Sequence, residues 1–155
     1  MLFRSAQGFD SFLNDKVNGF AYATKGNQYI GSKSTVRYPR DISTDWGVSG
    51  SFSAGFDSMI QLKDDRTYVT KGPLWIQYSG ARNVVDPGFP VGLDIGWGSL
   101  TENFKDGFDA MEAFPNGKVY VVKGSQYIRY SDTLATRVDD GYPVPIKGSW
   151  GDVPQ

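Results

Sequence analysis

The sequence contains neither cysteine nor histidine, and these two absences exclude most of the common site chemistries. Without cysteine the chain forms no disulfide, offers no thiolate nucleophile and holds no Cys-ligated zinc. Without histidine it can build no Ser-His-Asp relay, no imidazole general base and no His-ligated metal or haem. Enzymes that depend on those groups are therefore excluded.

An excess of charge of one sign is also missing, as is any long apolar run. The 155 residues carry 16 basic and 17 acidic side chains, which gives a net charge of −1. Duplex nucleic acid and anionic lipid both call for clustered Lys and Arg, so neither is an expected partner. No apolar run is long enough to span a membrane, and residues 1–20 lack the pattern of a secretory signal peptide. The compartment stays open.

Glycine and aromatic residues, in contrast, are abundant. Glycine accounts for 19 residues and aromatic residues for 15% of the chain. The apolar residues occur in short stretches between Gly, Pro, Asn and Asp, as short strands joined by tight turns require. No window shows a sustained helical period. Length and composition therefore predict a single all-β domain over residues 1–155.

One unit is repeated three times, with a period of about 46 to 53 residues. Each copy contains Gly-Phe-Asp, then Lys-Gly with a tyrosine three residues before the lysine, then Trp-Gly with a proline seven residues before the tryptophan. The tripeptides begin at Gly8, Gly55 and Gly107, the lysines are Lys25, Lys71 and Lys123, and the tryptophans are Trp46, Trp97 and Trp150. The copies cover about residues 8–52, 55–104 and 107–154.

The residue pattern of each copy predicts four short antiparallel strands followed by a short helical cap. The first hairpins are expected at Asn18-Gly19, Asp64-Asp65 and Asn116-Gly117, where Asn-Gly suits a two-residue type I′ turn. A fourth extended piece is expected at Val84-Val85 and at Arg137-Val138. The spacing from proline to tryptophan predicts a short helix that begins at the proline. Repeated four-stranded units are typical of a β-propeller, so the prediction is a propeller with three blades.

The unit resembles the hemopexin-like repeat over residues 8–154, and the third copy is the most similar. The matching segments there are Gly107-Phe108-Asp109-Ala110, Asn116-Gly117-Lys118-Val119-Tyr120, Lys123-Gly124-Ser125-Gln126-Tyr127-Ile128-Arg129-Tyr130 and Gly141-Tyr142-Pro143 through to Trp150. The second copy departs at Pro73-Leu74-Trp75, and the first has Ser32 where the others have a third-strand tyrosine. The resemblance implies four-stranded blades around a central channel, normally four to a disc, and no catalytic activity.

The resemblance also implies a cation site at Asp10, Asp57 and Asp109. In the family, the main-chain carbonyls at this position point into the channel and coordinate a cation, often calcium or sodium, and hard cations accept such oxygens. The alternative from the residues themselves is that the carboxylates hold turns by accepting backbone N–H bonds. No cofactor is required by either interpretation.

Other candidate ligand-binding residues are those that break the repeat, because the fold does not demand them. They are Trp75, beside a proline, and Arg37, Tyr38 and Arg40 in the long loop of the first copy. Packing or exposure to solvent remains the alternative for each of them. The repeated aromatics, which include Trp46, Trp97 and Trp150, are expected to be buried between blades.

The leading hypothesis is a non-catalytic binding module that recognises a protein partner. The alternative is a small-ligand binder for a glycan, a polyamine or haem. A hydrolase would need two converging carboxylates, whereas the neighbours in Asp64-Asp65 and Asp139-Asp140 are expected to point apart. We therefore do not expect an enzyme.

Three repeats do not make the usual disc of four blades. Blades with that geometry would leave two faces unmatched, with apolar surface that soluble monomers seldom expose. The alternatives are a homo-oligomer, a fourth blade supplied by a partner or by a further segment, and a tighter three-bladed ring. A two-fold dimer asks least beyond the chain itself and is the expectation.

Overall fold

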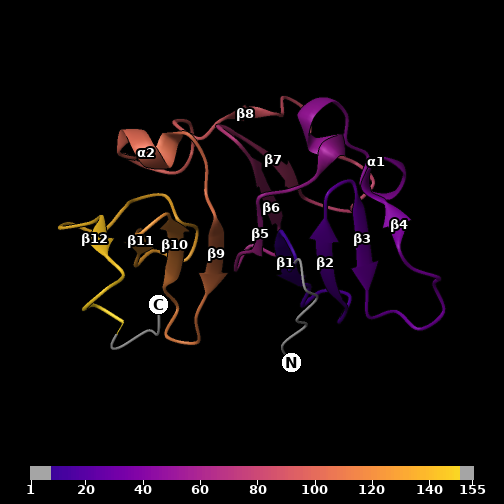
Figure 1. The fold of residues 1–155 in the computed structure, drawn as a ribbon, viewed down its shortest axis with the longest axis horizontal. Coiled ribbons are helices and arrows are strands. Elements are labelled where there is room, and N and C mark those ends of the chain that lie inside the picture. Colours follow the sequence, from indigo (N-terminus) through magenta and orange to yellow (C-terminus); the bar gives the residue numbers. More distant parts are fainter. Residues whose placement is uncertain (1–7, 151–155) are drawn as a thin grey trace.

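The computed structural model describes residues 8–150, and these form three four-stranded antiparallel sheets (Figure 1). Blade 1 contains β1 (Ser11–Asn14), β2 (Ala21–Lys25), β3 (Gln28–Gly31) and β4 (Arg40–Asp41) in that order. Blade 2 contains β5 (Ser58–Gln61), β6 (Thr67–Lys71), β7 (Leu74–Tyr78) and β8 (Val91–Gly92). Blade 3 contains β9 (Ala110–Ala113), β10 (Val119–Lys123), β11 (Gln126–Tyr130) and β12 (Val144–Pro145). The all-β class and the three blades are confirmed.

The blades are arranged as an open arc around a channel. β1 lies against β5, and β5 lies against β9, but no comparable contact joins β9 to β1 within the described residues. Figure 1 shows the three innermost strands near the centre and the short outer strands β4 and β12 at the periphery. The tighter three-bladed ring is therefore not the arrangement that this chain adopts.

Short helical segments cap one end of the arc, at the top of Figure 1. They are α1 (Ile42–Asp45), the 3₁₀ turn η1 (Gly50–Ala54) and α2 (Glu102–Lys105). Each contributes one buried apolar side chain, namely Ile42, Phe52 and Phe104. None of these is long and apolar enough to cross a bilayer, nor is any other helix in the described part of the chain.

Two local expectations about the fourth strand and the helix are wrong. The fourth strands lie at β8 and β12, several residues after Val84-Val85 and Arg137-Val138, although Val138 does make an isolated bridge to Tyr130. The prolines do not begin a helix. Pro39, Pro90 and Pro143 follow cis peptide bonds immediately before β4, β8 and β12, and the described helix nearest to any of them, α1, starts at Ile42.

The first hairpins lie where the sequence places them, but their turn type differs. In blades 2 and 3, Asp65 N–H donates to the Leu62 carbonyl and Gly117 N–H donates to the Phe114 carbonyl. Only Asp65 (φ 61°) and Gly117 (φ 81°) have positive φ there, whereas a type I′ turn needs two such residues. The loops are therefore longer than two residues, with one left-handed residue each.

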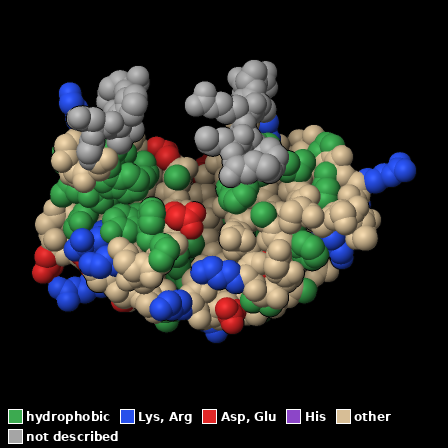
Figure 2. Space-filling model, turned by 90° about the horizontal axis from the view of Figure 1, so that it is seen from below, with side chains coloured by type: hydrophobic (Ala, Val, Ile, Leu, Met, Phe, Trp, Pro, Cys, Tyr) green, Lys and Arg blue, Asp and Glu red, His purple; other side chains and the backbone are tan. Residues whose placement is uncertain are grey.

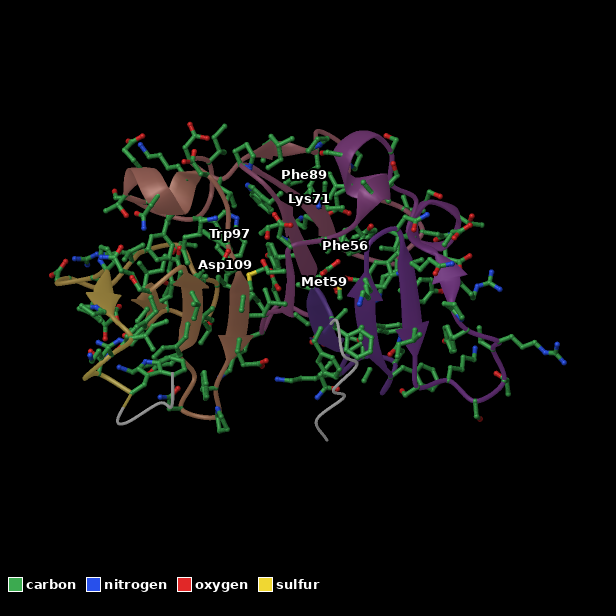
Figure 3. All side chains as sticks on the ribbon, in the orientation of Figure 1. Phe56, Met59, Lys71, Phe89, Trp97 and Asp109 are labelled. Carbon is green, nitrogen blue, oxygen red and sulfur yellow. The ribbon has the colours of Figure 1, made fainter. Side chains whose placement is uncertain are left out.

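The interfaces between blades repeat the same contacts around Trp46 and Trp97. Phe56 of blade 2 packs against Trp46 with ring centroids 5.5 Å apart, and Tyr78 O–H donates to the Trp46 carbonyl at 2.6 Å. In the next interface Phe108 lies 5.4 Å from Trp97, and Tyr130 O–H donates to its carbonyl at 2.7 Å. Figure 3 shows Trp97 between the second and third sheets. The predicted burial is confirmed for Trp46 and Trp97, each 2% exposed.

The glycine after each of these tryptophans permits the close approach of the next blade. A Cβ on Gly47 would lie 2.1 Å from the Asn83 carbonyl oxygen, and one on Gly98 would lie 2.8 Å from the Thr136 carbonyl oxygen. Both glycines also have positive φ. The Trp-Gly motif is therefore a device for packing one blade on the next.

Trp150 departs from the other two tryptophans and is 42% exposed. It contacts Phe114, Tyr120 and Tyr127, all within its own blade. No further sheet covers it within the described chain. The prediction that Trp150 is buried between blades is therefore wrong for this chain.

Candidate functional site

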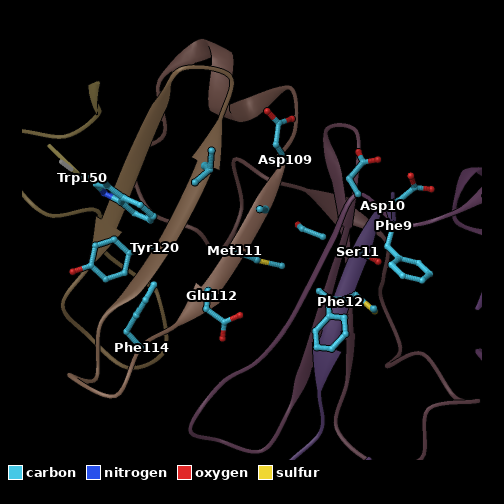
Figure 4. A pocket seen from close by; sticks show the side chains of 15 residues that line it. Phe9, Asp10, Ser11, Phe12, Asp109, Met111, Glu112, Phe114, Tyr120 and Trp150 are labelled. Atoms are coloured by element: carbon cyan, nitrogen blue, oxygen red, sulfur yellow. The ribbon is translucent and has the colours of Figure 1, made fainter. Parts of the chain in front are cut away.

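A cavity of about 440 Å³ lies along the channel and opens between blade 3 and blade 1 (Figure 4). Its lining comes mainly from the innermost strands of all three blades. The lining residues are Phe9, Asp10, Ser11, Phe12, Asp57, Ser58, Met59, Asp109, Ala110, Met111, Glu112, Phe114, Tyr120, Val122 and Trp150. The resemblance to the hemopexin-like repeat implies that the three repeated aspartates lie at one channel, and all three line this cavity.

The carboxylates of these aspartates hold the turns between the second and third strands. Asp10, Asp57 and Asp109 each accept the N–H of a turn glycine, at 2.6–2.7 Å. Lys71 Nζ lies 3.5 Å from Asp57 Oδ1, and Lys123 Nζ lies 3.6 Å from Asp109 Oδ1. The carboxylates therefore stabilise these turns as hydrogen-bond acceptors, which is the alternative that the residue types predict.

The hydrogen bonds of the three aspartate carboxylates limit which atoms could hold a cation in the channel. Among the described residues, no three acidic side chains gather closely enough to hold a metal ion. The aspartate carboxylates are already engaged by glycine N–H groups. A cation at this end of the channel would therefore fit only on backbone carbonyl oxygens of these positions, not on their side chains.

The other end of the cavity has apolar walls and exposed aromatic side chains. Phe12 is 51% exposed on β1, and Phe114 is 40% exposed just after β9. Figure 4 shows these two rings on opposite sides of the cavity, with Tyr120 and Trp150 beyond Phe114. Glu112 lies between them, and partial desolvation raises the pKa of its carboxyl. Figure 2 shows hydrophobic side chains gathered over blade 3 on this face.

Of the residues that break the repeat, Trp75 lies in the core. It is 7% exposed, and its indole N–H donates to the carbonyls of Gly92 and Ile95. Its ring packs between Tyr68 and Phe89. The geometry therefore favours the packing interpretation of Trp75 over ligand binding.

The three candidates in the long loop of blade 1 stay near the surface. Arg40 makes a two-point ion pair with Asp45, which also accepts the Tyr29 hydroxyl at 2.8 Å. This guanidinium holds the pKa of the Asp45 carboxyl below its usual range. Tyr38 packs edge-on against Tyr29 at 5.7 Å, and Arg37 is exposed to solvent. They do not converge on one cavity with Trp75.

Three of the four adjacent carboxylates are engaged by neighbouring side chains. Asp64 accepts the Tyr68 hydroxyl at 2.6 Å, and Asp139 accepts the Ser131 hydroxyl at 2.7 Å and pairs with Arg129. Asp140 lies 3.3 Å from Arg137 Nη2. These carboxylates hold loops, as expected for residues at loop tips.

A second cavity, of about 530 Å³, lies between blades 1 and 2 and was not predicted from the sequence. Three aromatic side chains, Tyr22, Tyr29 and Trp46, form one part of its wall, and the charged side chains Asp15, Asp45, Asp65 and Arg82 also line it. The signal that could have revealed it is a break in the repeat. The residue directly after the first strand is Asp15 in blade 1 but Leu62 in blade 2.

An ion pair between a buried carboxylate and a partly buried guanidinium lies at the base of this second cavity. Asp15 is 1% exposed and pairs with Arg82, whose other terminal nitrogen donates to Thr67 Oγ1 at 3.0 Å. Gln61 Nε2 donates to Asp15 Oδ1 at 3.0 Å. The Arg82 guanidinium also lies over the rings of Tyr22 and Trp46, at 5.3 and 5.5 Å. These contacts tie the loop after β7 to blade 1.

Comparison with known proteins supports the assignment of the repeat. The hemopexin family model matches residues 108–155. Matrix metalloproteinase-25 of Homo sapiens is 35% identical over 88 residues, which are 52% of this chain and 13% of that protein. The Mus musculus protein is 37% identical over 87 residues, 52% of this chain and 12% of that protein. The chain thus spans only a small part of the length of these relatives.

Solved structures share the fold at low sequence identity. The hemopexin fold protein CP4 from cow pea has a TM-score of 0.73 at 23% identity, covering 90% of this chain and 68% of that chain. A plant lectin with two metal binding sites from Cicer arietinum has a TM-score of 0.74 at 18% identity, covering 89% and 67%. A Cicer arietinum albumin showing hemagglutination has a TM-score of 0.74 at 20% identity, also covering 89% and 67%. The family match shows that the third copy is similar to the hemopexin repeat, and the shared blade architecture shows that the three copies have the hemopexin fold.

Proposed function

We propose that the chain is a non-catalytic binding module that recognises a protein partner at the opening between blades 3 and 1. The observation that carries the proposal is the exposed aromatic surface there, formed by Phe12, Phe114 and Trp150. Exposed apolar patches of this kind mark protein interaction sites on folded proteins. A partner that inserts an apolar segment between β1 and β9 would bury these rings.

Support for a binding role over a catalytic one comes from the polar groups along the channel. Glu112 is the one acidic side chain near the aromatic surface in the described chain, and the three aspartates are engaged as turn acceptors. Acid–base hydrolysis needs two carboxyl groups across a substrate. The channel offers no such pair around the aromatic surface.

Photo-crosslinking tests this proposal. A photoreactive phenylalanine analogue replaces Phe114 in one variant and Leu134 in another, because Leu134 is 44% exposed but lies outside the cavity. We expect one discrete protein to be crosslinked through position 114 and not through position 134. Equal labelling at the two positions, or none at position 114, would contradict the proposal.

We further propose that the channel holds a cation, calcium or sodium, on the backbone oxygens of Asp10, Asp57 and Asp109. The support is that all three residues line the channel cavity while their carboxylates are engaged elsewhere. Calorimetric titration with calcium, in buffers with and without sodium, tests it. Absence of heat and of any rise in melting temperature would overturn the calcium assignment.

A second candidate function is the binding of a small ligand, a glycan, a polyamine or haem. The observation that favours it is the cavity between blades 1 and 2, whose volume of about 530 Å³ lies in the usual range for ligand sites. The hemagglutination named for the Cicer arietinum albumin makes a glycan the first class to test. Thermal shift with glycans, spermine and haem separates the classes, because a ligand that binds the folded state raises its melting temperature.

A further inference from the structure

The cavity between blades 1 and 2 is polar at positions where the fold does not require polarity. Asp15 follows β1 and Thr67 begins β6. The corresponding residues in the next interface are Leu62 after β5 and Val119 at the start of β10, which pack together in one apolar cluster. Loops after β7 and β11 complete the two interfaces, the first with Arg82 and the second with the fully buried Ala135.

Blade packing alone therefore does not explain the polar residues between blades 1 and 2. Burying a charged pair costs desolvation energy, and apolar residues of similar volume often serve stability equally well. Residues that differ in character from their counterparts in the other repeats are expected mainly at functional sites. The polar cavity contains such residues.

The walls of the cavity combine aromatic rings with hydrogen-bonding groups. Tyr22, Tyr29 and Trp46 form a cluster with ring centroids 5.6–6.2 Å apart. The Tyr22 hydroxyl accepts from Asn18 Nδ2 at 2.9 Å, and its own proton has no acceptor within the described residues. That hydroxyl is therefore available to donate to a ligand.

The charges around the cavity are largely compensated within the protein. Arg82 pairs with Asp15, and Arg40 pairs with Asp45, which leaves Asp65 as the uncompensated carboxylate on the wall. An anionic ligand would meet no free cation among the described residues that line the cavity. A multiply charged cation would meet a single free carboxylate.

We propose that this cavity binds a neutral carbohydrate of one or two sugar rings, with C–H groups against the half-buried Tyr22 ring and hydroxyl groups on Tyr22, Asp45 and Asp65. Tyr29 and Trp46 lie buried behind that ring. The proposal rests on the second candidate function and names, for the same cavity, the ligand class and the residues that would bind it. Aromatic rings supply apolar contact area at low entropic cost, while carboxylates and hydroxyls accept and donate to sugar hydroxyls.

Isothermal titration of the full chain tests the ligand class. The neutral probes are lactose, maltose, cellobiose and chitobiose, and the charged probes are sialyllactose and spermine. We expect at least one neutral disaccharide to bind. Binding of none of them, or tighter binding of a charged probe, overturns the assignment of a neutral sugar.

Three single substitutions test the site itself. Tyr22→Phe removes only the free hydroxyl, and Asp65→Asn removes the free charge while keeping a residue type that tolerates positive φ. Each should weaken sugar binding about tenfold, the effect of one hydrogen bond. Tyr120→Phe is the matched control, because Tyr120 holds the same position in blade 3 but lines the channel cavity.

The outcomes separate this inference from the function on which it rests. Sugar binding that falls with Tyr22→Phe and not with Tyr120→Phe, at unchanged melting temperatures, supports the site. Sugar binding that is equal in all three variants overturns the site but leaves small-ligand binding standing. If neither neutral nor charged probes bind, both fail.

Discussion

The tryptophan at the end of each repeat lies in one of two environments, buried or partly exposed, and its contribution to stability depends on which. Trp46 and Trp97 are 2% exposed and contact the following blade through ring packing and a carbonyl that accepts a tyrosine hydroxyl. Among the described residues, the ring contacts of Trp150 all lie within its own blade, and its side chain remains 42% exposed. One sequence motif therefore gives two structural roles, set by whether a blade follows.

Substitution of these tryptophans by alanine should separate the two roles. Trp97→Ala should lower the free energy of unfolding by about 3–5 kcal/mol, because a large buried side chain is lost. Trp150→Ala should lower it by about 1 kcal/mol or less, because that ring packs on one side only. Urea unfolding followed by far-UV circular dichroism measures both, and equal losses would contradict the assignment.

Substitution of a repeated aspartate tests whether its main-chain carbonyl or its carboxylate would hold a cation. Asp57→Asn keeps an oxygen that can accept the Gly72 N–H and leaves the backbone carbonyl unchanged. We therefore expect calcium affinity, measured by calorimetry, to stay largely intact in this variant. Complete loss of calcium binding would instead assign the carboxylate as the ligand.

At the scale of elements, two blade interfaces with the same tryptophan contacts differ in their polar content. Asp15, Arg82 and Thr67 join blades 1 and 2, whereas an apolar cluster including Leu62 and Val119 joins blades 2 and 3. The first interface therefore depends on a charge pair that must stay complete, and the second does not.

Breaking and replacing the ion pair should have different effects on stability. Arg82→Met leaves the Asp15 carboxylate buried without its partner and should cost about 3–5 kcal/mol. Adding Asp15→Leu, the residue at the matching place in blade 2, should recover much of that loss because the unpaired charge is gone. Thermal and urea unfolding of both variants measure the recovery, and additive losses in the double variant would contradict this account.

The strand pattern could be predicted from the sequence because each blade repeats its own local signals. The positions of the first hairpins could be predicted from Asn116-Gly117 and its counterparts. The turn type could not, because these residues fit a longer loop with one left-handed residue as well as a two-residue turn. The fourth strands are only two residues long and pair only with the edge of the third strand. Such pairing is tertiary and leaves no periodic pattern in the sequence.

The candidate sites could likewise be predicted from the sequence only in part. Asp10, Asp57 and Asp109 could be placed at equivalent positions because the repeat aligns them, and in one channel because the repeat resembles the hemopexin-like family. Asp15 and Arg82 come from different blades, and only the packing of one blade on the next brings them together. Trp75 stood out in the sequence because it replaces a tyrosine, but its environment shows that the exchange belongs to the core.

For the whole molecule, the open arc leaves apolar surface on both sides of the channel opening. Phe12 on β1 and Phe114 after β9 are 51% and 40% exposed, with Trp150 beside Phe114. Within the arc, Trp46 and Trp97, the counterparts of Trp150, are covered by Phe56 and Phe108 of the following blade. The opening thus presents an incomplete interface of the type that the rest of the molecule completes.

Purified chain without its partner should therefore self-associate through this opening. Light scattering on a dilute sample should give a mass above the 17.1 kDa of one chain. A Phe12→Asp, Phe114→Asp double variant should shift the mass toward one chain, because charges on both sides of the opening oppose burial of that surface. Leu134→Asp, at an exposed leucine outside the cavity, is the control and should leave the association unchanged. A stable monomer that binds no hydrophobic dye would refute self-association and mean that the aromatic rings tolerate water without a partner.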